Sequence, residues 1–273
     1  MLKTDLEIAG IHVLISAPGD NLPGRFSGIC AAGEPANPAL TIDYRVAESV
    51  NPGSGISTSG TPGSLSFDIQ GISCELDLAE RKGKLVTVND DTVLEYALKV
   101  AFQWLLIHEC GSIIHAAGLI KGKRGYAFAG PPGAGKSTLA SLAPGEPDIV
   151  NDEHVAIIRE DDSVTLHPLP AWASPDRNPA PPPPAPLSAF FAIAHGESES
   201  MITGVTAAEQ TRRIFENMVF LPPEINSLGA AMDTADRIRK IIPVARLDFA
   251  LPDRENLWNG IEQYLENKIS KSA

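Results

Sequence analysis

The 273-residue sequence predicts an α/β protein, with a small β-rich N-terminal region ahead of a domain in which strands and helices alternate. Three observations support this class. Short apolar segments separated by turn residues fill residues 1–88, and helix-forming segments alternate with apolar runs after residue 89. A glycine-rich stretch at 130–137 also lies between an apolar run and a helix-forming segment. We therefore predict a β-rich region over 1–88 and a second domain over 89–273, with a connecting helix at 91–109.

The N-terminal region contains three apolar stretches that predict strands, at Leu6–Ile15, Leu40–Val46 and Leu65–Leu78. Between the second and third stretches, Asn51–Gly63 is dense in Gly, Ser, Thr and Pro, which indicates a loop or a wide hairpin connection. These residues form no catalytic pattern. We expect this region to be a β layer that supports the second domain or serves as a docking surface.

The connecting helix has clear start and stop signals. Asn89–Thr92 supplies capping and acidic residues, which satisfy the first free N–H groups and complement the helix dipole. The run Val93–His108 is helix-forming until Gly111 ends it. We expect a buried helix, with Lys99 and Gln103 opposite its apolar face.

The stretch Gly130-Pro131-Pro132-Gly133-Ala134-Gly135-Lys136-Ser137 fits the phosphate-binding pattern G-x-x-x-x-G-K-[ST]. An apolar strand, Gly125–Ala129, precedes it and a helix opening, Ser137–Ala143, follows, as this pattern requires. Glycines let backbone N–H groups approach phosphate oxygens, while the lysine adds a charge and the serine hydroxyl can join the shell of a Mg²⁺. The predicted nucleotide-binding residues are Gly130, Pro131, Pro132, Gly133, Ala134, Gly135, Lys136, Ser137 and Thr138.

Two segments flanking this stretch carry candidate polar groups. Ser112–Ile120 predicts a strand that turns back into the strand before the glycines, and on the residues alone its His115 is expected to be a hydrogen-bonded structural histidine. Pro147–Ile158 contains two apolar runs separated by Asp152 and Glu153. A carboxylate at a strand end beside a phosphate loop suits a metal ligand or the base of a phosphoryl transfer. The alternative is a solvated turn.

In order and spacing, three segments together resemble the catalytic core of HPr kinase/phosphorylase and its relatives, which share a fold with phosphoenolpyruvate carboxykinases. These segments are His115-Ala116-Ala117-Gly118, the glycine-rich stretch, and Val150-Asn151-Asp152-Glu153-x-Val155-Ala156-Ile157, and the resemblance covers residues 112 to 172. It implies a P-loop domain with a mixed sheet of this type and an active-site role for His115. It also implies that the acidic pair provides a base toward a serine hydroxyl and a ligand for the divalent metal.

This sequence departs from the family pattern in two ways. The second acid is Glu153 where the family usually has aspartate, so the assignment of base and metal ligand between Asp152 and Glu153 stays open. The glycine- and arginine-containing signature of the bifunctional enzymes is not recognisable downstream. The resemblance is therefore to the divergent branch, which includes kinases of peptides and of small serine-containing substrates. Since related kinases are commonly oligomeric, it also implies a homo-oligomer.

The remaining chain continues the alternation of strands and helices. A capping box, Thr206-Ala207-Ala208-Glu209, predicts a helix reaching about Phe220. On this helix Arg212 and Arg213 are expected to be exposed charges, with the alternative that one faces the phosphates. The other predicted elements are a buried strand at Leu187–Ala194, a helix at Ile225–Ile241, a strand at Val244–Leu251 and a final helix after Asp253.

Composition restricts the partners and the compartment. The net charge of −12 argues against nucleic-acid binding, which depends on Lys and Arg neutralising phosphates. The three cysteines form no CxxC pair and no secretory signal is recognisable, so we expect a cytoplasmic protein. The longest apolar stretch, Tyr96–Ile107, is too short to span a bilayer, so no membrane partner is expected.

Together these features predict a kinase that uses ATP and Mg²⁺ to phosphorylate a serine-type hydroxyl of a protein, peptide or small molecule. The expected catalytic residues are His115, Lys136, Asp152 and Glu153, and the expected metal ligands are Ser137, Asp152 and Glu153. One alternative is a regulatory module that senses a nucleotide without turnover. A nucleoside triphosphate hydrolase is less favoured, because no guanine-reading sequence follows and the acidic pair comes too early for the usual later acidic strand.

Overall fold

The computed structural model describes residues 2–18, 35–51, 57–59, 63–145, 147–169, 182–221 and 225–272. Its contacts divide the chain into two compact units. The first unit comprises Met1–His108, Pro170–Ala180 and Phe220–Ala230. The second unit comprises Glu109–Leu169, Pro181–Val219 and Ala231–Ala273. The domain boundary predicted after residue 88 stays a prediction.

The first unit contains a seven-stranded mixed sheet in the order β1-β2-β3-β7-β6-β5-β4. The pairs β2–β3 and β3–β7 are parallel and the remaining pairs are antiparallel. The strands are β1 (Leu2–Ile8), β2 (Ile11–Ala17), β3 (Leu40–Ala47), β4 (Ser57–Ser59), β5 (Ser64–Ile69), β6 (Ile72–Asp77) and β7 (Lys82–Val88). The β-rich N-terminal region predicted from the sequence is therefore confirmed.

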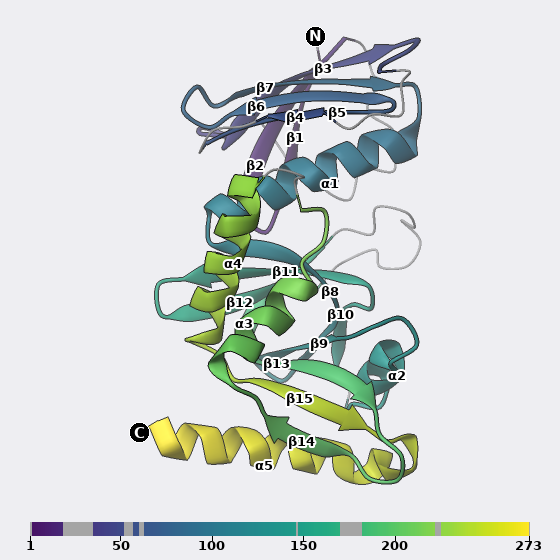
Figure 1. The fold of residues 1–273 in the computed structure, drawn as a ribbon, viewed down its shortest axis with the longest axis vertical. Helices are drawn as coiled ribbons and strands as arrows, with labels where there is room; N and C mark the ends of the chain where they lie inside the picture. Colours follow the sequence, from purple (N-terminus) through teal and green to yellow (C-terminus); the bar gives the residue numbers. More distant parts are fainter. Residues whose placement is uncertain are drawn as a thin grey trace. The chain divides into compact units, whose positions relative to one another are not determined.

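Helix α1 (Asp91–His108) contacts β6 and β7 and lies along one face of this sheet (Figure 1). Asp90 begins it, since its carboxylate accepts a hydrogen bond from the Thr92 N–H at 2.7 Å. Trp104 is fully buried in α1. Gln103 is also fully buried, so the side of α1 opposite its predicted apolar face is covered as well. Lys99 is paired with Glu95 at 2.6 Å.

The second unit contains an eight-stranded mixed sheet in the order β10-β8-β11-β12-β13-β15-β14, with β9 paired to both β8 and β13. The pairs β13–β15 and β13–β9 are parallel. The strands are β8 (Gly111–Lys121), β9 (Arg124–Ala129), β10 (Asp148–Asn151), β11 (His154–Glu160), β12 (Ser163–Pro168), β13 (Ala185–His195), β14 (Met201–Gly204) and β15 (Val244–Phe249). Two mixed sheets with flanking helices confirm the α/β class.

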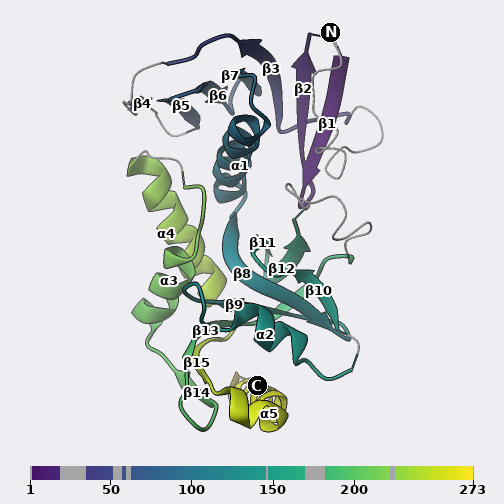
Figure 2. The same cartoon turned by 90° about the vertical axis from the view of Figure 1, so that its right-hand side faces the viewer.

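Among the described residues, four α-helices and the short 3-10 helix η2 (Leu251–Asp253) accompany the second sheet; the α-helices are α2 (Lys136–Ser141), α3 (Ala207–Glu216), α4 (Ile225–Arg239, of which the part from Ala231 belongs to this unit) and α5 (Arg254–Ser272). Helices α2 and α5 share one buried cluster with β9, β13 and β15, in which Phe128 and Phe191 stack at 5.6 Å. Helix α3 lies beside α4 (Figures 1 and 2), and Thr211 donates a hydrogen bond to Asp236 at 3.3 Å. Apolar packing therefore holds α2 and α5 against the central strands, and a hydrogen bond joins α3 to α4.

Two predicted strands are in fact hairpins. Leu6–Ile15 contains the turn between β1 and β2, where Ala9 and Gly10 have φ of 52° and 80°. Leu65–Leu78 likewise contains the turn between β5 and β6, with Gly71 at φ 85°. Left-handed backbone at a glycine permits such a tight reversal, and a continuous apolar pattern does not reveal it.

Helix α3 starts as predicted, because the Thr206 hydroxyl accepts the Glu209 N–H at 3.3 Å. It ends at Glu216 and not near Phe220. Met218 instead forms a bridge with Ile114 of β8.

No helix in the described ranges is long and apolar enough to cross a membrane. Cys30 lies outside the described residues.

Candidate functional site

The predicted glycine-rich loop (Gly130–Ser137) connects β9 to α2, so the expected strand–loop–helix order is present. Gly133 and Gly135 have φ of 81° and 93°, in the left-handed region that favours glycine. A Cβ on Gly130 would lie 2.7 Å from the backbone oxygen of Ile193, and one on Gly135 would lie 3.0 Å from the Phe249 ring. The loop conformation therefore requires its glycines.

Lys136 is folded against the loop. Its Nζ donates hydrogen bonds to the carbonyl oxygens of Gly130 at 2.8 Å and Pro131 at 3.3 Å. The residue is only 9% exposed, and this burial lowers the pKa of Lys136 while the Glu153 carboxylate acts in the opposite direction. The ammonium group is thus held at the base of the loop. Ser137 and Thr138, in the first turn of α2, are exposed.

His115 lies on β8 at the position where the glycine-rich loop begins. The register of β8 and β9 pairs Ala116 with Ala129, so the preceding residue, His115, is level with the start of the loop. On the other edge of β8, His115 pairs with His154 of β11, and the two rings lie 5.5 Å apart. Burial and the Lys136 charge lower the pKa of His115, so its imidazole is neutral near neutral pH.

The acidic pair lies in the turn between β10 and β11. Asn151 fixes this turn, since its side-chain oxygen accepts the N–H groups of Glu153 at 2.8 Å and His154 at 3.0 Å. The Glu153 carbonyl also accepts the N–H of Ala116 at 3.1 Å, which ties the turn to β8 next to His115. The Glu153 side chain is 71% exposed, and Asp152 is exposed as well.

The fold therefore brings His115, Lys136 and Glu153 into one electrostatic group. The Glu153 carboxylate acts on the pKa of both His115 and Lys136, in each case against the downward effect of burial. Asp152 precedes Glu153 in the same turn. These residues come from three separate segments of the second unit.

A cavity of about 370 Å³ opens beside the loop. The predicted residues that line it are His115, Gly130, Pro131 and Pro132. Lining residues that the sequence analysis did not assign to a site are Ala129, Ala192, Ile193, Arg213, Glu216, Asn217 and Val219. Of the α3 residues, the sequence pointed only to Arg212 and Arg213. They were expected to be exposed charges, with the alternative that one of them faces the phosphates.

The donor types of the predicted metal ligands suit a Mg²⁺ bound together with a nucleotide. Magnesium is commonly held by one or two carboxylates and substrate phosphates, and Ser137, Asp152 and Glu153 offer a hydroxyl and two carboxylates of this kind. Among the described residues, no three or more His, Cys, Asp or Glu side chains gather as a metal-binding cluster. A site completed by phosphate oxygens needs no such cluster.

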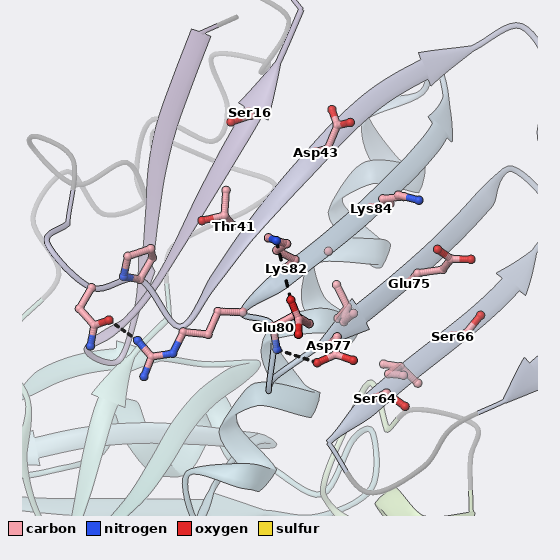
Figure 3. A pocket seen from close by; sticks show the side chains of 16 residues that line it. Ser16, Thr41, Asp43, Ser64, Ser66, Glu75, Asp77, Glu80, Lys82 and Lys84 are labelled. Carbon is pink, nitrogen blue, oxygen red and sulfur yellow. Dashed lines mark hydrogen bonds and ion pairs between the residues drawn. The ribbon is translucent and has the colours of Figure 1, made fainter.

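A larger cavity, of about 1250 Å³, lies in the first unit (Figure 3). Side chains of β3, β5, β6 and β7 line it, with acids such as Asp43 and Glu75 alternating with bases such as Lys82 and Lys84. Glu75 and Lys84 are cross-strand partners, as expected for a solvated sheet face. The described residues that line this cavity include no glycine-rich phosphate-binding loop, and the supporting or docking role of the first unit stays a prediction.

Comparisons with known proteins give a distant structural similarity. No family model matches the chain, and no curated protein matches it. Among solved structures, the chain is similar to the HPr(Ser) kinase/phosphatase from Coxiella burnetii, with 15% sequence identity and a TM-score of 0.32. The match covers 59% of this chain and 97% of that one. A similarity at this level assigns no activity to this chain.

Proposed function

We propose that this chain is a kinase that transfers the terminal phosphoryl group of ATP to a serine-type hydroxyl of a protein, peptide or small molecule. The observation that carries the proposal is the grouping of the glycine-rich loop, Lys136, His115 and the turn of Asp152 and Glu153 in one unit. Phosphoryl transfer depends mainly on placement and charge neutralisation, and this group contains the parts needed for both.

The loop and Lys136 would hold the phosphates. Left-handed glycines at 133 and 135 turn the backbone tightly, so that loop N–H groups can face phosphate oxygens. Lys136 is already aligned along the loop by two carbonyl oxygens, and phosphate oxygens would be stronger partners for its ammonium group than these. A Mg²⁺ held by Ser137 and one carboxylate would neutralise charge on the phosphate oxygens.

The acidic pair and His115 would act at the acceptor. One carboxylate of Asp152 and Glu153 takes the proton of the acceptor hydroxyl as its oxygen bonds to the terminal phosphorus. The bond from that phosphorus to the bridging oxygen breaks, and ADP leaves with the electron pair. His115, neutral in its partly buried position, orients this carboxylate or the terminal phosphate through a hydrogen bond.

Incubation with ATP and Mg²⁺ tests the proposal, with ADP release and mass spectrometry of candidate acceptors as the readouts. A kinase releases ADP in proportion to an acceptor that gains a phosphoryl group on serine. Binding of Mg·ATP without turnover would instead indicate a nucleotide-sensing module. Release of free phosphate without any acceptor would indicate a hydrolase, and absence of nucleotide binding would remove the proposal.

A further inference from the structure

The cavity beside the loop exists because two segments separate along β8. Strand β9 runs beside β8 as far as Ala129 and then leaves the sheet as the glycine-rich loop. Beyond that point the same edge of β8 is hydrogen-bonded to the segment after α3. The His115 N–H donates to Asn217 O at 2.8 Å, and the Val219 N–H donates to Ile113 O at 3.1 Å. Crevices at the ends of parallel strands are common ligand sites in α/β folds, and this one lies beyond the end of β9, which is parallel to β13.

The two adjacent arginines of α3 have different surroundings. Arg212 is 54% exposed and donates to the Glu216 carboxylate at 2.9 Å, as a surface ion pair. Arg213 lines the cavity and its side chain is 22% exposed. Its Nε is buried and donates to no acceptor among the described residues, and its terminal nitrogen is 3.7 Å from Glu209. Arg213 is therefore a partly desolvated cation with unused hydrogen-bonding capacity.

Arg213 supplies the positive charge among the described residues that line the cavity. Among the described lining residues it is the only Lys or Arg. The Glu216 carboxylate also lines the cavity and accepts a hydrogen bond from Arg212 at 2.9 Å. The backbone of Arg213 is held in place, because its carbonyl accepts the Asn217 side-chain amide at 2.7 Å. A guanidinium presented in this way is suited to bidentate binding of phosphate or carboxylate.

We propose that this cavity is an oxyanion subsite in which Arg213 binds an anionic group opposite the glycine-rich loop. The inference rests on the proposed function and deepens it, because the anion is either the phosphoryl group in transfer or an anionic group of the acceptor. Both sources share the same chemistry, a multi-oxygen anion that the planar guanidinium can bind through two N–H groups. Arg213 would thus position one of the reactants against His115 and the loop.

The first experiment titrates inorganic phosphate into the full chain saturated with Mg·ADP, using calorimetry. Arg213→Gln is expected to weaken phosphate binding about tenfold or more, as for loss of a charged hydrogen-bond pair. Arg45→Gln, which removes an exposed arginine of the first unit that does not line this cavity, is the control and should leave it unchanged. Equal phosphate affinity in the wild type and both variants, or no phosphate binding by the wild type, would overturn the subsite.

A second arm separates the two sources. If the anion is the phosphoryl group, Arg213→Gln weakens a non-hydrolysable ATP analogue but not ADP; if it belongs to the acceptor, both nucleotides bind as in the wild type and phosphate binding alone weakens. Arg213→Lys keeps the charge and should retain part of the affinity. Equal losses in Arg213→Lys and Arg213→Gln together with a lower thermal midpoint would assign a structural role and contradict the proposal.

The failure of the proposed function can be recognised independently. If the wild type binds no ADP, the phosphate titration without nucleotide still decides whether Arg213 forms an anion site. Phosphate binding that depends on Arg213 would then support the subsite while the kinase proposal fails. Normal ADP binding with phosphate binding that ignores Arg213 would leave the kinase proposal in place and remove the subsite.

Discussion

Gly135→Ala adds a single methyl group, yet it should weaken nucleotide binding strongly because the backbone and the space at Gly135 do not accommodate a Cβ. Gly135 has φ of 93°, and a residue with a Cβ pays about 1–2 kcal/mol for left-handed backbone. The new Cβ would lie 3.0 Å from Cδ1 and 3.1 Å from Cε1 of Phe249, a ring buried in the core, and overpacking of this kind costs about 1–3 kcal/mol. The loop would relieve this strain by leaving its native conformation.

The measured nucleotide affinity falls in proportion to the fraction of molecules whose loop has the native conformation. Since about 1.4 kcal/mol corresponds to a tenfold change in a dissociation constant, the affinity of Gly135→Ala for Mg·ADP should fall about tenfold or more. Gly145→Ala is the matched control, because Gly145 has φ of 87° with no atom within 4 Å of the added Cβ and lies outside the loop. Calorimetric titration gives the affinities and thermal unfolding checks the fold. Wild-type affinity in Gly135→Ala would refute the claim that this loop geometry binds phosphates.

Three further predictions concern charge, pH and packing. Lys136→Ala should weaken Mg·ATP binding about tenfold or more, because a partly buried cation is lost from the phosphates, and unchanged affinity by titration would contradict the role of Lys136. The lowered pKa of His115 means that the unfolded chain binds its proton more readily, so acidification through 6.5 should reduce wild-type stability more than that of His115→Gln; parallel urea-unfolding curves across this range would contradict it. Trp104→Ala should destabilise the chain by about 3–5 kcal/mol in urea unfolding, because a fully buried indole leaves a cavity, and a loss below 1 kcal/mol (about the level of a surface change) would contradict its core position.

The fold class could be predicted because its signals are local. The turn residues and apolar alternation of the first 88 residues, the caps of α1 and α3, and the strand–loop–helix pattern around Gly130–Ser137 each depend on neighbouring residues. The hairpin at Gly10 and the burial of Gln103 could not be predicted this way. A polar side chain in a helix is placed by its tertiary partners, which the helical period does not contain.

For the candidate site, too, some residues could be predicted from the sequence and others could not. The loop, His115 and the acidic turn were predicted from order and spacing, and strand pairing places His115 beside the other two segments. Arg213 was ambiguous in sequence because Arg212 is its neighbour and both precede a helix end. In the structure Arg213 lines the cavity, whereas Arg212 is exposed and paired with Glu216, because neighbouring residues of a helix point to different sides of it. Pairing between segments far apart in the sequence produces no periodic pattern of residues from which it could be predicted.

The most direct test of the account is the ³¹P spectrum of Mg·ATP with a phosphorylatable acceptor, recorded for the wild type, Asp152→Asn and Glu153→Gln, with nucleotide affinity measured in parallel. We expect the wild type to convert ATP into ADP and a phosphoserine-type ester. Each variant should bind nucleotide nearly as well as the wild type while the ester signal falls at least about a hundredfold, as for loss of a general base in one variant and of a metal ligand in the other. Ester formation at wild-type rates in both variants would contradict the assignment of this acidic turn to phosphoryl transfer.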